Sequence, residues 1–340
     1  MKKLTIALLI LITISGNAQS LTAETVKAFQ TRETPVHDPV MIMQDGTYYV
    51  FCTGMGVTVY SSRDMKNWTP HSPVFNTAPD WAVKAVPGFQ GMIWAPDISF
   101  HNGQYYLYYA VSAFGKNTSC IGLAVNKTLD TTSADFKWND VGKVIQSVPG
   151  RDMWNAIDPN LFVDDDNTPY LVFGSFWEGI KMVKLNNDLT SIAQPEEWHT
   201  IARRPRNFSF PDENAGNAAI EAPFIFKKDK YYYLFVSWDY CCRGEKSDYK
   251  VVMGRSEKIT GPYLGIAGHD MFYGGGALIV QGDNINWYGA GHNSVYNFKG
   301  RDYIVYHGYD AKDQGRSKLI IKQLKWQDGW PLAPSQQTTQ

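Results

Sequence analysis

Short apolar runs, paired around turn-forming residues, recur along the whole chain. One pair runs from Leu161-Phe162-Val163, through a polar turn, to Tyr170-Leu171-Val172-Phe173. Runs of this length, rich in β-branched and aromatic residues, predict β-hairpins. The dipeptides Asp45-Gly46 and Asn102-Gly103 separate two further pairs, and both favour tight hairpin turns because they tolerate positive φ. The pattern therefore predicts a chain built almost entirely from hairpins.

The hairpin unit occurs five times, and a polar residue stands at the start of each unit. These residues are Asp38, Asp97, Asp158, Glu221 and His292. The starts lie roughly 60 to 70 residues apart, which indicates radially repeated β-sheets. We therefore predict an all-β fold, a single five-bladed β-propeller that covers residues 30–335. The polar stretch 187–219 is the longest predicted loop, and no stretch after residue 29 shows helical periodicity.

Residues 1–20 have the features of a secretory signal peptide. Lys2 and Lys3 supply positive charge, residues 4–14 are apolar, and small residues follow at 16–18. The apolar run is shorter than the about 20 residues that a transmembrane helix needs, and no other stretch is long and apolar enough. We expect a secreted or periplasmic protein without a membrane span.

The composition indicates a neutral partner. The 340 residues carry a net charge of -1, and aromatic residues make up 14% of the chain. A nucleic-acid partner would require a basic face, so we expect none. Sugars present C–H faces that pack on flat rings, so we expect a carbohydrate partner, which the family resemblance described below makes a polysaccharide. We expect the protein to be a monomer.

The four cysteines are too few for a disulfide framework. Cys52 and Cys120 fall in or near apolar strands, which favours buried free thiols. The adjacent Cys241 and Cys242 could bond to each other, pair with other cysteines, or stay reduced.

Three acidic side chains are expected to meet at one end of the propeller. The innermost strand of each blade lines the axis, so residues at the strand starts converge. Asp38 and Asp158 stand directly before prolines, which favours extended backbone, and Glu221 occupies the corresponding place in the fourth repeat. Asp97 follows its proline, so its side chain should point elsewhere.

Carboxyl groups gathered in a neutral, aromatic cleft suit glycoside hydrolysis. That reaction needs one acid to protonate the leaving oxygen and one base to activate water, and a third carboxylate can raise the pKa of the acid. The alternative is structural, because an Asp beside Pro often caps a turn. Turn capping does not explain Glu221, since Glu is a poor turn former.

Several motifs resemble glycoside hydrolase family 43, and its arabinan endo-1,5-α-L-arabinanases in particular. The resemblance extends from about His37 to Gly329-Trp330-Pro331, nearly the whole mature chain. It is carried by His37-Asp38-Pro39, Trp94-Ala95-Pro96-Asp97-Ile98, Trp154-Asn155-Ala156-Ile157-Asp158-Pro159-Asn160, Gly174-Ser175-Phe176-Trp177, Ile220-Glu221-Ala222-Pro223-Phe224, Tyr240-Cys241-Cys242-Arg243-Gly244 and Gly289-Ala290-Gly291-His292-Asn293-Ser294.

The resemblance implies a five-bladed propeller and hydrolysis with inversion. It implies that Asp38 is the general base, that Glu221 is the general acid, and that Asp158 tunes and orients the acid. For inversion, the carboxyls of Asp38 and Glu221 should be about 6.5–9.5 Å apart. His292 matches the position that holds a metal, usually calcium, with a shell made mostly of water; the alternative is a histidine hydrogen-bonded in the axial channel. Ala290 replaces the more usual proline of that motif.

Substrate contacts are expected from side chains beside these motifs. The resemblance places Trp94 and Phe114 in the cleft, Trp177 also lies beside a motif, and Asn155 and Ser175 could bind sugar hydroxyls. The alternative for the aromatic residues is core packing between blades. The predicted function is endo-acting hydrolysis of α-1,5-L-arabinan. The alternatives are an exo-acting α-L-arabinofuranosidase or β-xylosidase, and a carbohydrate-binding propeller without catalysis.

Overall fold

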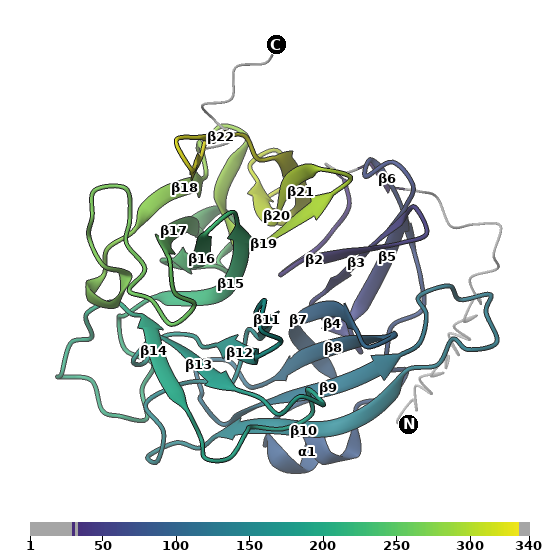
Figure 1. The fold of residues 1–340 in the computed structure, drawn as a ribbon, viewed down its shortest axis with the longest axis horizontal. Helices are drawn as coiled ribbons and strands as arrows, with labels where there is room; N and C mark the ends of the chain where they lie inside the picture. The colour runs from purple at the N-terminus through teal and green to yellow at the C-terminus, as the bar shows by residue number, and fades with distance from the viewer. Residues whose placement is uncertain (1–28, 31–32, 333–340) are drawn as a thin grey trace, which may run out of the picture.

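The structure is a computed structural model that describes residues 29–30 and 33–332. The predicted signal peptide, residues 1–20, lies outside the described residues, as do residues 333–335 of the predicted domain. Five antiparallel sheets stand around a central axis and form a five-bladed β-propeller (Figure 1). The predicted all-β, five-bladed fold is confirmed.

Each blade is a meander whose strands follow one another from the axis outward, with two additions. The short strand β4 joins the inner edge of blade 2, and β1 joins the outer edge of blade 1. Blades 1 and 2 have five strands each. Blade 1 consists of β2 (Val40–Gln44), β3 (Thr47–Cys52), β5 (Thr58–Ser62), β6 (Asn67–Pro70) and β1 (Phe29–Gln30), and blade 2 consists of β4 (Gly54–Met55), β7 (Met92–His101), β8 (Gln104–Val111), β9 (Ser119–Asn126) and β10 (Asn139–Ser147).

Blades 3 and 4 have four strands each, and blade 5 has three. Blade 3 consists of β11 (Asn160–Val163), β12 (Pro169–Phe173), β13 (Ile180–Lys184) and β14 (Trp198–Ala202). Blade 4 consists of β15 (Ile220–Lys228), β16 (Tyr231–Trp238), β17 (Lys250–Ser256) and β18 (Ala277–Gln281), and blade 5 consists of β19 (Trp287–Phe298), β20 (Arg301–Asp310) and β21 (Arg316–Gln323).

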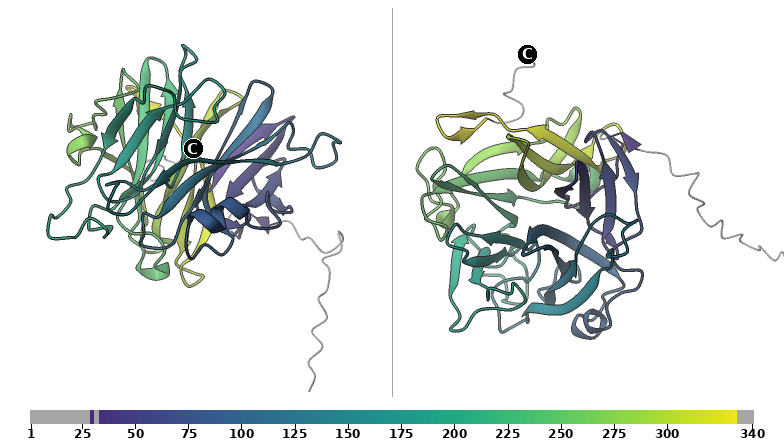
Figure 2. Two further views of the ribbon diagram at one scale, coloured as in Figure 1. Left: turned by 90° about the horizontal axis from the view of Figure 1, so that it is seen from below. Right: turned by 45° about the vertical axis from the view of Figure 1, so that its right-hand side comes forward.

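A few short elements lie outside the blades. The hairpin of β22 (Trp326–Gln327) and β23 (Trp330–Pro331) follows blade 5, and α1 (Asp80–Ala85) packs against β9 and β10 at the rim (Figures 1 and 2). Helix α1 was not predicted, because six residues with only Ala82 buried give no periodic apolar face. Two 3₁₀ turns complete the list, η1 (Gly244–Lys246) and η2 (Met271–Tyr273).

The predicted loop 187–219 is wrong in one part, because it contains β14, the outer strand of blade 3. The turn predictions hold: Asp45 and Gly46 have φ of 50° and 75°, and Asn102 and Gly103 have φ of 50° and 78°. Positive φ at both central residues matches the twist of the flanking strands.

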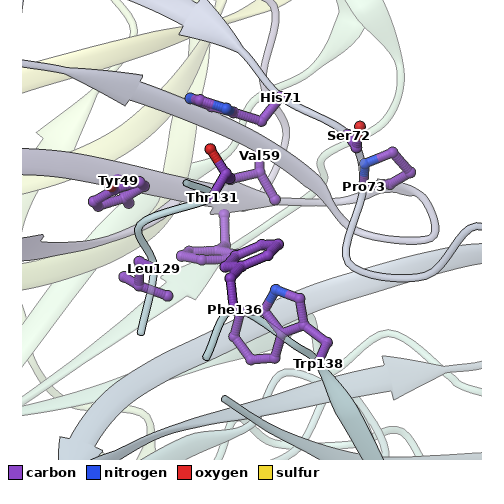
Figure 3. Close-up of a pocket in the computed structure, with 10 residues that line it drawn as sticks. Tyr49, Val59, His71, Ser72, Pro73, Leu129, Thr131, Phe136 and Trp138 are labelled. Atoms are coloured by element: carbon purple, nitrogen blue, oxygen red, sulfur yellow. The ribbon is translucent and has the colours of Figure 1, made fainter. Parts of the chain in front are cut away.

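Apolar side chains fill the five gaps between neighbouring blades, one cluster to each gap in the described part of the chain. Between blades 1 and 2 the packing leaves a cavity of about 220 Å³ (Figure 3). Phe51 and Trp138 meet edge to face there, with ring centroids 5.8 Å apart, and His71 and Thr131 also line the cavity. Many aromatic residues therefore pack blade against blade, as the structural alternative for them predicted.

The ring is closed by contacts between blade 5 and the segment before blade 1. Leu319 N–H on β21 donates to Thr34 O (3.0 Å), and Ser294 Oγ on β19 donates to Pro39 O (3.0 Å). These contacts hold the innermost strands of the first and last blades side by side. Asp38 lies just before the first of these strands, β2, and His292 lies on the other, β19.

Candidate active site

The blade starts have a strained backbone. Asp38, Asp158 and His292 have φ of 56°, 58° and 50°. The expected extended geometry before proline is therefore wrong for Asp38 and Asp158. In blade 4 the residue with this conformation is Ala222, with φ of 55°, so Glu221 lies one residue earlier than its counterparts. The left-handed region costs a non-glycine residue about 1–2 kcal/mol, and such strain clusters at functional sites.

Asp38 is a buried carboxylate with three side-chain donors. His37 Nδ1 lies 2.7 Å from Oδ1, and His292 Nδ1 lies 2.9 Å from the same atom. Thr53 Oγ1 donates to Oδ2 (2.5 Å). Burial by itself raises the pKa of Asp38, but the charge of His292 and the hydrogen bonds from both histidines outweigh burial and hold the pKa well below its usual range. Asp38 is therefore ionised and ready to accept a proton.

Glu221 is held in one orientation by two hydroxyl groups. Ser175 Oγ donates to Oε2 (2.7 Å), and Tyr249 OH donates to Oε1 (2.7 Å). Tyr249 is 1% exposed, so its ring is fixed by the surrounding core. Both carboxyl oxygens thus have a defined direction, which suits a group that must deliver a proton to one atom.

Asp158 lies in the same cluster. Its Oδ2 accepts the backbone N–H of Ala222, the residue after Glu221 (3.1 Å). Burial raises the pKa of Asp158, and the negative charges of Glu221 and Asp38 raise it further, against the opposing charge of His292. Burial and the two neighbouring negative charges therefore favour the protonated form of Asp158.

Asp97 points away from this cluster, as predicted. Its oxygens accept Leu161 N–H (2.8 Å) and Asn160 Nδ2–H (3.3 Å), which ties blade 2 to blade 3. Burial raises its pKa to about 7, and these hydrogen bonds oppose the rise. The structure thus gathers Asp38, Asp158 and Glu221 and leaves Asp97 in a structural role.

Comparisons with known proteins agree with this arrangement. The model of glycosyl hydrolases family 43 matches residues 32–331. The chain belongs to glycosyl hydrolases family 43. It is therefore a glycoside hydrolase, and the predicted family is confirmed.

Three relatives of this family 43 enzyme are informative. The extracellular exo-α-(1→5)-L-arabinofuranosidase of Cellvibrio japonicus is 53% identical over 88% of this chain and 86% of its own length. The extracellular endo-α-(1→5)-L-arabinanase 1 of Bacillus subtilis is 42% identical over 87% of each. The solved structure of Cellvibrio cellulosa α-L-arabinanase with arabinohexaose has a TM-score of 0.87 and 52% identity, over 89% of this chain and 96% of that one.

Among the predicted substrate contacts, Phe114 is 82% exposed, and Trp94 on β7 is half-buried. Asn155 is buried; its Nδ2 donates to Lys116 O (3.3 Å), while its Oδ1 has no hydrogen-bond partner among the described residues. The contact of each of these three side chains with a sugar stays a prediction.

One predicted contact is corrected. Trp177 is 1% exposed, and its Nε1 donates to Asp212 O (2.8 Å), so it cannot offer a ring face to a sugar. Trp177 lines a cavity of about 440 Å³ together with Phe208 and Tyr273. Ser175 gives its hydroxyl hydrogen to Glu221, so it positions the carboxyl group; its contact with a sugar hydroxyl, as an acceptor, stays a prediction.

His292 fits the expected metal only as a single ligand. Its Nδ1 faces Asp38, so Nε2 alone remains for an ion. Close groups of three potential ligands in the described chain are His37 with Cys241 and Cys242, and His37 with Asp38 and His307. Neither group contains His292. Calcium prefers six or more oxygen ligands, so an ion at His292 would have to be held mostly by water, and the calcium site stays a prediction.

The cysteines divide as the sequence allowed. Cys52 and Cys120 are buried free thiols, as predicted, and burial raises their pKa values to about 12 and about 11. Cys241 and Cys242 form a disulfide with each other.

No helix in residues 29–30 and 33–332 has the length and apolar content to cross a membrane.

The sequence did not indicate the residues that support the acids. His37 and Thr53 hold Asp38, and Tyr249 holds Glu221. His37 stood in a quoted motif, so its proximity to Asp38 could have been anticipated. Tyr249 begins no motif and lies 28 residues after Glu221, so only the pairing of β16 with β17 brings it to the site.

Proposed function

We propose that this family 43 enzyme is exported and hydrolyses α-1,5-linked L-arabinofuranose in arabinan. The carboxylate cluster supports hydrolysis, because an ionised base and an oriented carboxyl group occur together. The substrate is inferred from the relatives, two of which are named for α-(1→5)-arabinan bonds and one of which was solved with arabinohexaose. Two relatives are named extracellular enzymes, in agreement with the predicted signal peptide.

The proposed reaction is a single displacement with inversion. Asp38 takes a proton from water as the water oxygen bonds to the anomeric carbon, and Glu221 gives its proton to the departing oxygen as the glycosidic bond breaks. The observation that carries this assignment is the pair of hydroxyl donors on Glu221, together with an ionised Asp38 whose Oδ2 accepts one hydrogen bond and keeps one acceptor site for water. Asp158 fixes the backbone after Glu221.

A calcium ion, if held through His292, would supply positive charge beside the acids. The residues that bind and orient substrate do not depend on it: Asn155 offers a free carbonyl oxygen, and Phe114 offers an exposed ring.

Exo action, from the end of the arabinan chain, and endo action, within the chain, are the two candidate modes of cleavage. The sequence predicts endo action, whereas the relative with 53% identity is named exo-acting and the relative with 42% identity is named endo-acting. The higher identity favours exo action. Product sizes from linear arabinan separate the two, because exo action gives one small product from the start and endo action gives mixed oligomers.

Replacement of the two acids tests the proposal. Asp38→Ala and Glu221→Ala should each lower kcat on arabinan by a factor of about 10² or more, with circular dichroism and thermal unfolding close to wild type. Glu213→Ala, at an exposed acid, is the matched control and should keep full activity. Proton NMR of the first product should show the inverted anomer. Near-normal turnover in either variant would refute its role, and binding of arabino-oligosaccharides without any cleavage would favour a non-catalytic propeller.

A further inference from the structure

The loop between β16 and β17 lies beside Asp38, the proposed base. Within it, Cys241 and Cys242 are joined by a disulfide. Cys242 is exposed and has φ of 66°, and its Sγ lies 3.7 Å from His37 Nε2. The disulfide therefore contacts the histidine that holds Asp38.

A chain of hydrogen bonds connects this loop to Asp38. The Asp38 N–H donates to His307 Nδ1 (3.1 Å), so the hydrogen of His307 is on Nε2, which lies 3.3 Å from Tyr309 OH. The Cys242 N–H also donates to Tyr309 OH (2.7 Å). The tyrosine oxygen thus accepts two hydrogens, its full capacity.

Two neighbours can take the hydroxyl hydrogen of Tyr309: His37 Nε2, 2.9 Å away, and the side chain of Ser247. Donation to His37 leaves the hydrogen of that histidine on Nδ1. His37 Nδ1 lies 2.7 Å from Asp38 Oδ1, so this hydrogen faces the carboxylate. In this arrangement the Cys242 N–H is the first donor of a relay that ends on Asp38.

We propose that the Cys241–Cys242 disulfide is a positioning element that orients His37, and through it Asp38, for catalysis; the inference rests on the function proposed above. A non-glycine residue is strained at positive φ, because its Cβ approaches the following carbonyl oxygen. The disulfide closes a small ring through the peptide bond between the cysteines, and the ring limits the relaxation of Cys242. Once the ring is open, the Cys242 N–H can turn away, Tyr309 loses a donor, and the tautomer of His37 is no longer fixed.

The exposed pair makes this element sensitive to thiols. A dithiol such as dithiothreitol breaks the S–S bond, Cys241 and Cys242 each gain an electron and a proton, and the dithiol is oxidised to its cyclic disulfide. Removal of the dithiol in air reverses the step, with molecular oxygen as the oxidant. An oxidising, extracellular setting keeps the ring closed.

Steady-state kinetics on linear arabino-oligosaccharides test the relay. Dithiothreitol should lower the kcat of the wild type by about tenfold, a part of the 10²–10⁴-fold that a general base contributes. KM should stay within about twofold, since Asp38 acts on water, and kcat should recover on reoxidation. Tyr309→Phe should have a similarly lowered kcat without dithiol and should show no further loss with it.

Two cysteine variants identify the bond and the cause. Cys241→Ser with Cys242→Ser should have a lowered kcat that does not respond to dithiol, which separates this pair from Cys52 and Cys120. Cys241→Ser with Cys242→Gly should recover part of kcat, because glycine adopts positive φ readily. Reduction of the wild type needs no mutation, so a variant that fails to fold does not prevent the test.

Three results would overturn the relay. One is an unchanged kcat in protein whose two thiols are shown by labelling to be reduced. The second is an equal loss on reduction in the wild type and in Tyr309→Phe, which would place the effect elsewhere. The third is a glycine variant no more active than the serine variant. Failure of the proposed function is separate, because it would appear as full activity of oxidised Asp38→Ala.

Discussion

Gly291 makes room for the ring that holds Glu221, so Gly291→Ala should damage both stability and catalysis. A Cβ at this position would lie 2.3 Å from Tyr249 Cδ1 and 2.6 Å from Cε1. Carbon atoms in contact are normally about 3.5–4.0 Å apart. The ring would therefore have to withdraw by about 1 Å or more.

The surroundings of Tyr249 leave little space for that movement. The ring is buried and stacks on His307 with centroids 5.8 Å apart. Overpacking of this kind costs about 1–3 kcal/mol of unfolding free energy. The hydroxyl would also leave Glu221 Oε1, to which it donates at 2.7 Å. A displacement of about 1 Å in a catalytic group can cost about 10²-fold in rate, so kcat should fall by about 10- to 100-fold.

Two measurements on three variants separate these effects. Urea unfolding followed by tryptophan fluorescence gives stability, and initial rates on linear arabinan give kcat. Tyr249→Phe removes the hydroxyl without crowding, so it should lose about tenfold in kcat with little change in stability. Gly103→Ala, at an open turn position with φ of 78°, should cost about 1 kcal/mol and leave kcat unchanged.

A Gly291→Ala protein with wild-type kcat and an unchanged urea midpoint would refute this reasoning. It would show that Tyr249 can withdraw freely and that its hydroxyl does not orient the acid. A loss of stability with full activity would refute only the second part.

Three further predictions concern single groups. Burial raises the pKa of Asp97 from 3.8 to about 7, so Asp97 contributes fully to the unfolding free energy below about pH 4, and this contribution of roughly 4 kcal/mol is lost as the pH rises to about 7. Between pH 4 and pH 8, Asp97→Asn should therefore lose less unfolding free energy than the wild type. Equal losses in the two proteins would contradict the assignment. Asp158→Asn removes a carboxyl group from the cluster, so the optimum of kcat/KM should move to lower pH, and a pH profile that stays in place would show that Asp158 does not tune the acid. Chelation with EDTA should lower kcat several-fold, with recovery on addition of calcium and no response in His292→Ala; full activity of protein shown by elemental analysis to be metal-free would end the calcium hypothesis.

Much of the architecture could be predicted from local chemistry. The turns at Asp45-Gly46 and Asn102-Gly103 have the positive φ that their residues favour. The inner two strands of each blade were visible because their apolar runs are long and buried. Outer strands such as β14 were not predicted, because their residues are half-exposed and the proline-containing segment before β14 is typical of a loop.

The site was only partly predictable, for reasons of geometry. The order of residues shows that acids recur at the blade starts, but not that Ala222 takes the position of Asp38 and shifts Glu221 by one residue. Exposure was equally hidden: Trp177 and Phe114 are both aromatic residues beside the site, yet one is 1% exposed and the other 82% exposed.

The amino-acid sequence alone predicts the hairpins, through side-chain periodicity and turn chemistry within a few residues. It also predicts the number of blades and the acids at their starts, because the same unit recurs roughly every 60 to 70 residues. The groups that orient those acids became visible only in the folded protein. Ser175 reaches Glu221 from blade 3, His292 reaches Asp38 from blade 5, and the Cys241–Cys242 bond contacts His37 from blade 4. The distances between blades depend on how five separate apolar clusters pack around one axis.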